Sequence, residues 1–164
     1  MNYDLYHELN KNISFARATS EYIMHPNQLN PQGSIHGGEL IKIMDMVAGI
    51  VARKHSRGMV LSKRLDDIVF HKPVYLGDLV TVIGQLIYVG RSSMEIMVQI
   101  YRTKVSDSLD PELVVSGFVT MVHLVDDTPS QVPGLVVNSK EERILYELGK
   151  KRHQEIREKL MNSK

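Results

Sequence analysis

The pattern of apolar and polar positions divides the chain into one long helix and a set of strands. Apolar side chains recur at helical spacing from about residue 36 to residue 57, and Gly58 follows as a stop signal. Beyond this helix the period changes to two. Strands are predicted over residues 16–24, 59–70, 78–89, 93–103 and 113–125. The last of these is apolar almost throughout, which is typical of a strand covered on both faces.

The order of these elements predicts the fold class. One strand, a long apolar helix and four further strands joined by short connections indicate an α+β fold with an antiparallel meander of strands. We expect the helix to lie against the inner face of a sheet of about five strands. A second, charged amphipathic helix is predicted over 139–159, capped by Ser139 with Glu142 three residues later. We interpret 1–15 as an N-terminal arm, 16–127 as the domain, and 128–164 as a linker and C-terminal helix.

Composition narrows the classes of function. With 164 residues, 20 basic and 19 acidic side chains, the chain has the size of one domain and no net field to recruit nucleic acid or anionic membrane. It has no cysteine, which excludes thiolate metal sites and cysteine nucleophiles. The histidines show no metal-binding spacing. The start carries no signal-peptide pattern, and no apolar run approaches the roughly 18–20 residues of a membrane span. We therefore expect a cytoplasmic protein without membrane insertion or a metal.

One carboxylate, Asp45, interrupts the apolar helix. Aspartate is about 0.6 kcal/mol less favourable than alanine inside a helix, and its neighbours Met44, Met46 and Val47 indicate partial burial. At 100° per residue, Asp45 lies at the edge of the apolar face, beside the small Ala48. A carboxylate at such a boundary can serve as a general base. A solvated helix residue and an interface salt bridge are the alternatives.

The start of the same helix, His36-Gly37-Gly38, is a second candidate. Unpaired N–H groups and the positive end of the helix dipole lie there, and glycines allow a ligand to approach closely. Tight packing of the helix start would explain these glycines equally well. Gly38 and Asp45 are seven residues apart, about 10.5 Å along a helix axis, which is too far for both to act on one carbonyl carbon. If both act on one substrate, two copies of the helix must meet, so the spacing predicts a dimer with the site at its interface.

Several ordered blocks, which together extend over roughly residues 15–155, are similar to one family. They are NPQGSIHGGELIKIMDMVAGIVARKH (30–55), Asp66 with Ile68 and Phe70, KPVYLGD (72–78), VGRSSMEI (89–96), VPGLV (132–136) and EERILYELGKKR (141–152). In these blocks the chain resembles the hotdog-fold cytosolic acyl-CoA thioesterases, the family of brain acyl-CoA hydrolase. The resemblance implies a hotdog fold for the domain and hydrolysis of acyl-CoA to a free carboxylic acid and CoA.

The resemblance also implies a set of site residues. Asp45 and Asn30 match the family's helix aspartate and loop asparagine, which come from opposite halves of a dimer. The dimers assemble into hexamers as trimers of dimers. No cofactor is implied, because CoA is part of the substrate and product. The implied substrate-binding residues are His36, Gly37, Gly38, Phe70, His71, Gly90, Arg91, Ser92 and Ser93.

Simpler interpretations stay open for several of these residues. Asn30 stands before a proline and could be a turn residue. The stretch from Gly90 to Ser93 could be a hairpin turn, although an arginine beside hydroxyls also suits phosphate. His36 is expected to be structural rather than a base. The chain differs from residues frequent in the family at His25, Gln28, Val69 and Lys63-Arg64.

These residues suggest a mechanism with two rivals. The N–H groups of Gly37 and Gly38 would polarise the thioester oxygen, and Asp45 would activate a water or, alternatively, attack as a nucleophile. Asn30 would orient the water or the carbonyl. One rival is a non-catalytic acyl-CoA sensor of the same fold, which retention of Asp45 and Asn30 disfavours. The other is a dehydratase acting on acyl thioesters, which would need a histidine partner for Asp45 and finds only His36.

Overall fold

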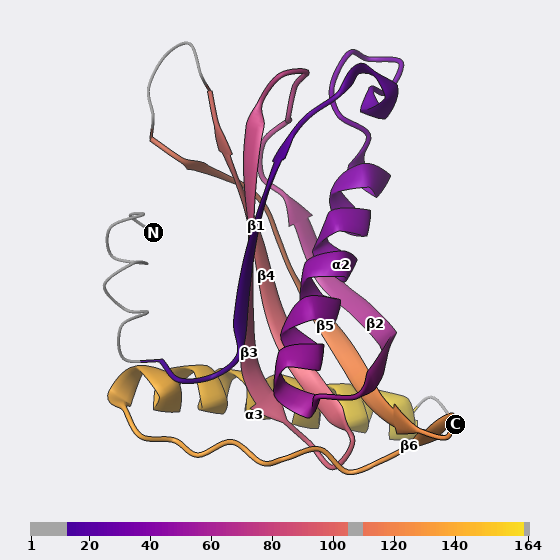
Figure 1. Ribbon diagram of the computed structural model, residues 1–164, viewed down its shortest axis with the longest axis vertical. Coiled ribbons are helices and arrows are strands. Elements are labelled where there is room, and N and C mark those ends of the chain that lie inside the picture. Colours follow the sequence, from indigo (N-terminus) through magenta and orange to yellow (C-terminus); the bar gives the residue numbers. More distant parts are fainter. Residues whose placement is uncertain (1–12, 105–109, 163–164) are drawn as a thin grey trace.

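The computed structural model describes residues 13–104 and 110–162, which form one antiparallel sheet and two long helices (Figure 1). Helix α2 (Gly37–Ser56) lies along one face of the sheet, and helix α3 (Lys140–Asn162) crosses behind the strands. Most of the predicted N-terminal arm, residues 1–12, lies outside the described residues. Within the described residues no helix has the length and hydropathy to cross a membrane. The strands are β1 (Arg17–Ile23), β2 (Met59–Phe70), β3 (Leu79–Val89), β4 (Ser93–Thr103), β5 (Glu112–Val125) and the short β6 (Thr128–Pro129).

The strand order is β1-β3-β4-β5-β2, with β6 paired to β5. Only β3, β4 and β5 therefore form a meander, and the prediction that all four strands after the helix do so is wrong. Helix α2, about 30 Å long, carries the chain across the face of the sheet. As a result β2 pairs with β5 at one edge, while β1 pairs with β3 at the other. Alternation along a strand determines which side chains face the core, but it does not determine the neighbouring strand.

Helix α2 packs its predicted apolar face on the sheet. A close approach is possible because Gly84 of β3 lies under the helix, where a Cβ atom would come within 2.9 Å of Val51 and 3.0 Å of Val47. The helix ends at Arg57, which adopts the left-handed conformation with φ 56°. Gly58, the predicted stop signal, has a different role, since a Cβ there would lie 2.5 Å from Nε2 of His123. The residues of α2 buried against the sheet are Leu40, Ile43, Met44, Val47, Ala48, Val51 and Ala52.

Helix α3 covers the opposite face of the sheet. It approaches the sheet closely at Gly149, where a Cβ atom would lie only 2.4 Å from Cβ of Tyr88 on β3. The cover explains why Glu95, on the polar side of β4 by alternation, is only 1% exposed. Burial on both faces was predicted for β5, and its successive residues Val114 and Val115, which point to opposite faces, are both fully buried.

The start of α3 is held by the buried carboxylate of Glu142. It accepts hydrogen bonds from Ser14 N and Ser14 Oγ, both 2.6 Å, from Asn138 N at 2.5 Å and from Ser139 N at 3.3 Å. Glu142 N in turn donates to Ser139 Oγ at 3.1 Å, so the predicted pairing of Ser139 with Glu142 is confirmed. Burial raises the pKa of Glu142, but the hydrogen bonds to Ser14, Asn138 and Ser139 outweigh it, and the net pKa is lowered.

We expect Glu142→Gln to lower the free energy of unfolding by about 2 kcal/mol at pH 7, because it removes charged hydrogen bonds. A carboxyl whose folded pKa is lowered stabilises the fold above its unfolded pKa and loses that effect as the pH falls through the folded value. The loss of stability should therefore shrink as the pH falls below 4.5, the ordinary pKa of a glutamate. Urea unfolding of both proteins at pH 7 and pH 3.5 measures it, with Glu141→Gln as the control. An equal cost at both pH values would contradict this role.

Candidate active site

Asp45 lies half-buried in an open groove between α2 and the edge strand β2. The groove has a volume of about 410 Å³. Its polar centre is a hydrogen bond that Ser62 Oγ of β2 donates to Asp45 Oδ1 of α2. The donated bond holds the carboxylate toward the groove and leaves Oδ2 available. The groove is lined by Asp45, Met46, Gly49, Ile50, Arg53, Val60, Leu61, Ser62 and Met121.

Ser62 is a site residue that the sequence analysis missed. No motif marks it, yet a length argument could have found it. A strand rises about 3.3 Å per residue and a helix 1.5 Å. When a strand turns back along the preceding helix, it covers the same distance with about half as many residues. A strand residue therefore lies level with a helix residue that is about twice as many positions from the turn. Asp45 lies about 18 Å before Arg57 along the helix and Ser62 about 13 Å beyond Gly58 along the strand, so the relation places Ser62 within about one helical turn of Asp45.

The rim of this groove is apolar and exposed. Met46 is 48% exposed, Ile50 41% and Leu61 58%. Strand β2 beside them is an edge strand of the sheet. Exposed apolar side chains next to an open strand edge are features of a surface that another chain covers.

Asn30 lies in the loop before α2 and organises that loop. Its Oδ1 accepts hydrogen bonds from Gln32 N at 3.0 Å and Ser34 N at 3.1 Å, while its Nδ2 donates to Ser34 Oγ at 2.8 Å. This is the turn role that the sequence left open. The amide still has a second Nδ2 hydrogen to offer. Asn30 is not among the residues that line the Asp45 groove.

The helix start has one N–H group committed to capping. His36 is the N-cap, and its Nδ1 accepts a hydrogen bond from Gly38 N at 2.9 Å. His36 thus caps the helix, and its implied contact with substrate stays a prediction. The prediction that both glycine N–H groups polarise a ligand oxygen is wrong for Gly38, whose N–H is taken by this cap. The Gly37 N–H has no partner among residues 13–104 and 110–162, and its role toward a ligand stays a prediction.

Phe70 and His71 lie at the same end of the molecule as the helix start. The Phe70 ring, half-exposed, lies over Gly37, where a Cβ atom would come within 3.1 Å of it. His71 follows at the end of β2, with Nε2 2.8 Å from Ser116 Oγ. Because Gly37 has no side chain, the Phe70 ring can lie against it, and the Gly37 N–H group remains available.

The stretch from Gly90 to Ser93 is the turn between β3 and β4. Gly90 N donates to Ser93 O at 2.9 Å, and the turn's carbonyls accept from Val132 N at 3.0 Å (at Arg91) and His123 N at 2.9 Å (at Ser92). The backbone is thus fixed by neighbouring segments. The Arg91 side chain is exposed and has no ion-pair partner in the described part of the chain.

A single chain does not bring these groups together. The Asn30 loop and the start of α2 lie at one end of the sheet, and the Gly90–Ser93 turn lies at the other (Figure 1). Strand β3, 11 residues long, connects the two ends and spans about 36 Å at 3.3 Å per residue. Asp45 lies between them on α2. A substrate that contacts all three regions requires a second chain.

Comparison with known proteins assigns the family. Residues 32–107 match the sequence profile of the thioesterase superfamily. An uncharacterized acyl-CoA thioester hydrolase of Zymomonas mobilis is 38% identical over 112 residues, covering 68% of this chain and 74% of the relative. The human cytosolic acyl coenzyme A thioester hydrolase is 32% identical over 149 residues, or 90% of this chain. The chain spans only 39% of the length of that relative.

Solved structures agree in fold. The acyl-CoA hydrolase of Staphylococcus aureus, solved with butyryl-CoA and CoA, superposes with a TM-score of 0.82 at 28% identity over 92% of both chains. Alanine variants of its aspartate, asparagine and threonine have also been solved. A hexameric thioesterase from Yersinia pestis is 30% identical, with a TM-score of 0.65 over 70% of this chain and 93% of its own. The hotdog fold is confirmed, and the chain belongs to the acyl-CoA thioester hydrolase family of the thioesterase superfamily.

Proposed function

We propose that this protein hydrolyses acyl-CoA thioesters to a carboxylic acid and CoA. The observation that carries the proposal is the Asp45–Ser62 hydrogen bond in its groove. In the S. aureus acyl-CoA hydrolase, the asparagine and threonine that were replaced by alanine lie 15 positions before and 17 positions after the replaced aspartate. Asn30 and Ser62 have the same spacing from Asp45.

In this mechanism Asp45 acts as a general base, oriented by Ser62. It takes a proton from a water whose oxygen attacks the thioester carbonyl carbon. Gly37 N–H of the partner subunit donates to the developing oxyanion. Asn30 of the partner subunit orients the water or the carbonyl through its remaining Nδ2 hydrogen. The C–S bond then breaks, and the departing thiolate receives the proton held by Asp45. No step requires a metal or cofactor.

Two identical subunits supply each site in this proposal. The exposed apolar rim around Asp45 and the open edge of β2 support pairing there. The hexameric Yersinia pestis thioesterase supports an assembly of six chains, and we propose that these are arranged as a trimer of dimers. The cytosolic name of the human relative supports a cytoplasmic location. The division at residues 16–127 stays a prediction.

Thiol release from acyl-CoAs of graded chain length tests this function. We expect the purified chain to release free thiol with saturable kinetics, since the site has its base, its orienting hydroxyl and an N–H donor. If the chain binds CoA esters but releases no thiol, the sensor interpretation replaces the proposal. Water addition across an enoyl-CoA without thiol release would favour the dehydratase instead.

A further inference from the structure

Helix α3 reaches the turn between β3 and β4 through two residues one helical turn apart. Gly149 lies against Tyr88, and His153 lies against Gly90, where a Cβ atom would come within 3.2 Å of the imidazole. Residues i and i+4 share one helix face, and residues i and i+2 share one strand face. Both contacts therefore belong to one interface. The His153 ring also packs on Tyr88, with centroids 5.2 Å apart.

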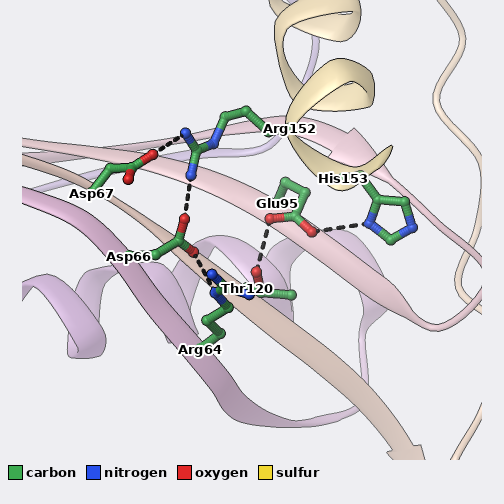
Figure 2. Close-up of polar contacts among 7 residues, drawn as sticks. All are labelled: Arg64, Asp66, Asp67, Glu95, Thr120, Arg152 and His153. Carbon is green, nitrogen blue, oxygen red and sulfur yellow. Dashed lines mark hydrogen bonds and ion pairs between the residues drawn. The ribbon is translucent and has the colours of Figure 1, made fainter. Parts of the chain in front are cut away.

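A buried carboxylate fixes His153 in this position. Glu95 of β4 is 1% exposed, and its Oε1 lies 3.2 Å from His153 Nδ1. Its Oε2 accepts a hydrogen bond from Thr120 Oγ1 at 2.8 Å. Figure 2 shows Glu95 of β4 between Thr120 of β5 and His153 of α3, with one contact to each. Both oxygens of the carboxylate thus have partners.

The neighbouring residue ties α3 to the far edge of the sheet. Arg152 forms ion pairs with Asp66 and Asp67 of β2 (Figure 2). Its guanidinium also lies 3.5 Å from the centre of the Phe118 ring. Arg152 thus holds the helix to β2 through contacts that involve neither His153 nor Glu95.

The chemistry of the Glu95 network is costly for stability alone. Burying a carboxylate carries a large desolvation penalty, and apolar residues of similar volume often stabilise a protein as well or better. What a buried polar pair can add is a defined geometry. Here the group whose position it defines is the imidazole beside Gly90.

We propose that Glu95 and His153 are positioning residues that hold the Gly90–Ser93 turn in the shape that binds the phosphates of CoA. The turn's carbonyls are tied on one side by Val132 N and His123 N. His153 restrains it on the other side. The proposal rests on the proposed function and on the assignment of this turn as the phosphate site. It predicts that contacts from α3 affect KM through binding of the nucleotide part of the substrate.

The test is a double variant, Glu95→Met with His153→Leu, which replaces the polar pair by apolar groups. KM and kcat are measured with one acyl-CoA and with the pantetheine thioester of the same acid, which lacks the phosphates of the nucleotide. We expect KM for the acyl-CoA to rise about tenfold with kcat within about twofold, a loss of binding rather than of chemistry. KM for the pantetheine thioester should stay at the wild-type value, and the melting temperature should not fall.

Two further variants keep the test decisive. Glu95→Gln retains an acceptor for Thr120 and a partner for His153, so its KM for acyl-CoA should rise less than about threefold. Gln154→Leu, an exposed neighbour on α3, is the matched control and should behave as wild type. If the double variant does not fold, the single change His153→Leu takes its place.

An unchanged KM for acyl-CoA in a folded double variant would overturn the proposal while thioester hydrolysis by the wild type still stood. Equal increases in KM for both thioesters would also overturn it, because the effect would then not concern the phosphates. So would a Glu95→Gln variant as impaired as the double variant. Absence of thiol release by the wild type would instead refute the proposed function.

Discussion

Replacing Asp45 by asparagine is expected to lower kcat for acyl-CoA hydrolysis by about a thousandfold, within the range for loss of a general base. Asparagine keeps the shape of the side chain and still accepts the hydrogen bond from Ser62 Oγ, but it cannot take a proton from water. KM should change little, because the carboxylate acts on the water rather than on the acyl or nucleotide part. Steady-state thiol release by the wild type and the variant measures both constants.

Two further variants provide comparisons for this loss of kcat. Ser62→Ala keeps the carboxylate and removes only its orienting hydrogen bond, so we expect kcat to fall about tenfold, near the low end of effects for such donors. Glu39→Gln removes the other carboxylate of α2, which forms an ion pair with Lys42 at 3.9 Å, and should leave kcat unchanged. A wild-type rate for Asp45→Asn would contradict the mechanism, as would equal losses for Asp45 and Glu39.

A single turnover distinguishes a general base from an anhydride that water opens at the Asp45 carbonyl. With excess enzyme in water enriched in ¹⁸O, a general base delivers the solvent oxygen directly to the acid product. An anhydride that water opens at the Asp45 carbonyl delivers an unlabelled oxygen first. We expect label in the acid from the first turnover, since Ser62 holds one carboxylate oxygen and leaves the other toward the groove.

The secondary structure followed closely from local pattern. The predicted strand over 93–103 has the bounds of β4, and the predicted helix over 36–57 differs from α2 only at its cap residues. These features depend on side-chain alternation and helix capping, which are determined by residues close together in the sequence. The strand order was wrong because the pairing of β2 with β5 joins residues that are far apart in the sequence, from Phe70 with Val115 to Met59 with Leu124. Alternation carries no information about such partners.

For the candidate site, too, the sequence indicated features that depend on neighbouring residues and missed those that depend on distant ones. Asp45 was found because an acidic residue inside an apolar helix is unusual in sequence terms. Ser62 was missed, since its importance arises only when β2 returns beside α2. The role of Gly38 was predicted wrongly because its N–H donates a hydrogen bond to the imidazole of His36. That bond depends on the side-chain rotamer of His36, which the sequence does not specify.

Mixing two inactive variants should restore activity if each site is shared between subunits. Asn30→Asp keeps the two hydrogen bonds that Oδ1 accepts in its loop but removes the Nδ2 donor. Asp45→Asn removes the base. A dimer with one chain of each kind has one site with neither residue altered and one with both altered. Random pairing at equal amounts makes half the dimers mixed, so about one quarter of wild-type activity should return.

The experiment co-expresses the two variants under different tags, isolates oligomers that carry both, and compares their kcat per chain with each variant alone. If the oligomers that carry both tags are hexamers of randomly paired dimers, they should reach about one quarter of the wild-type value, and if they are single mixed dimers about half, because one of the two sites in each mixed dimer is intact. A rate equal to the mean of the two variants alone would place Asn30 and Asp45 in the same chain's site. We expect activity to be restored because Asn30 and Asp45 of one chain lie apart. Asn30 does not line the Asp45 groove, and the turn at Gly90 lies at the opposite end of a strand about 36 Å long from the Asn30 loop.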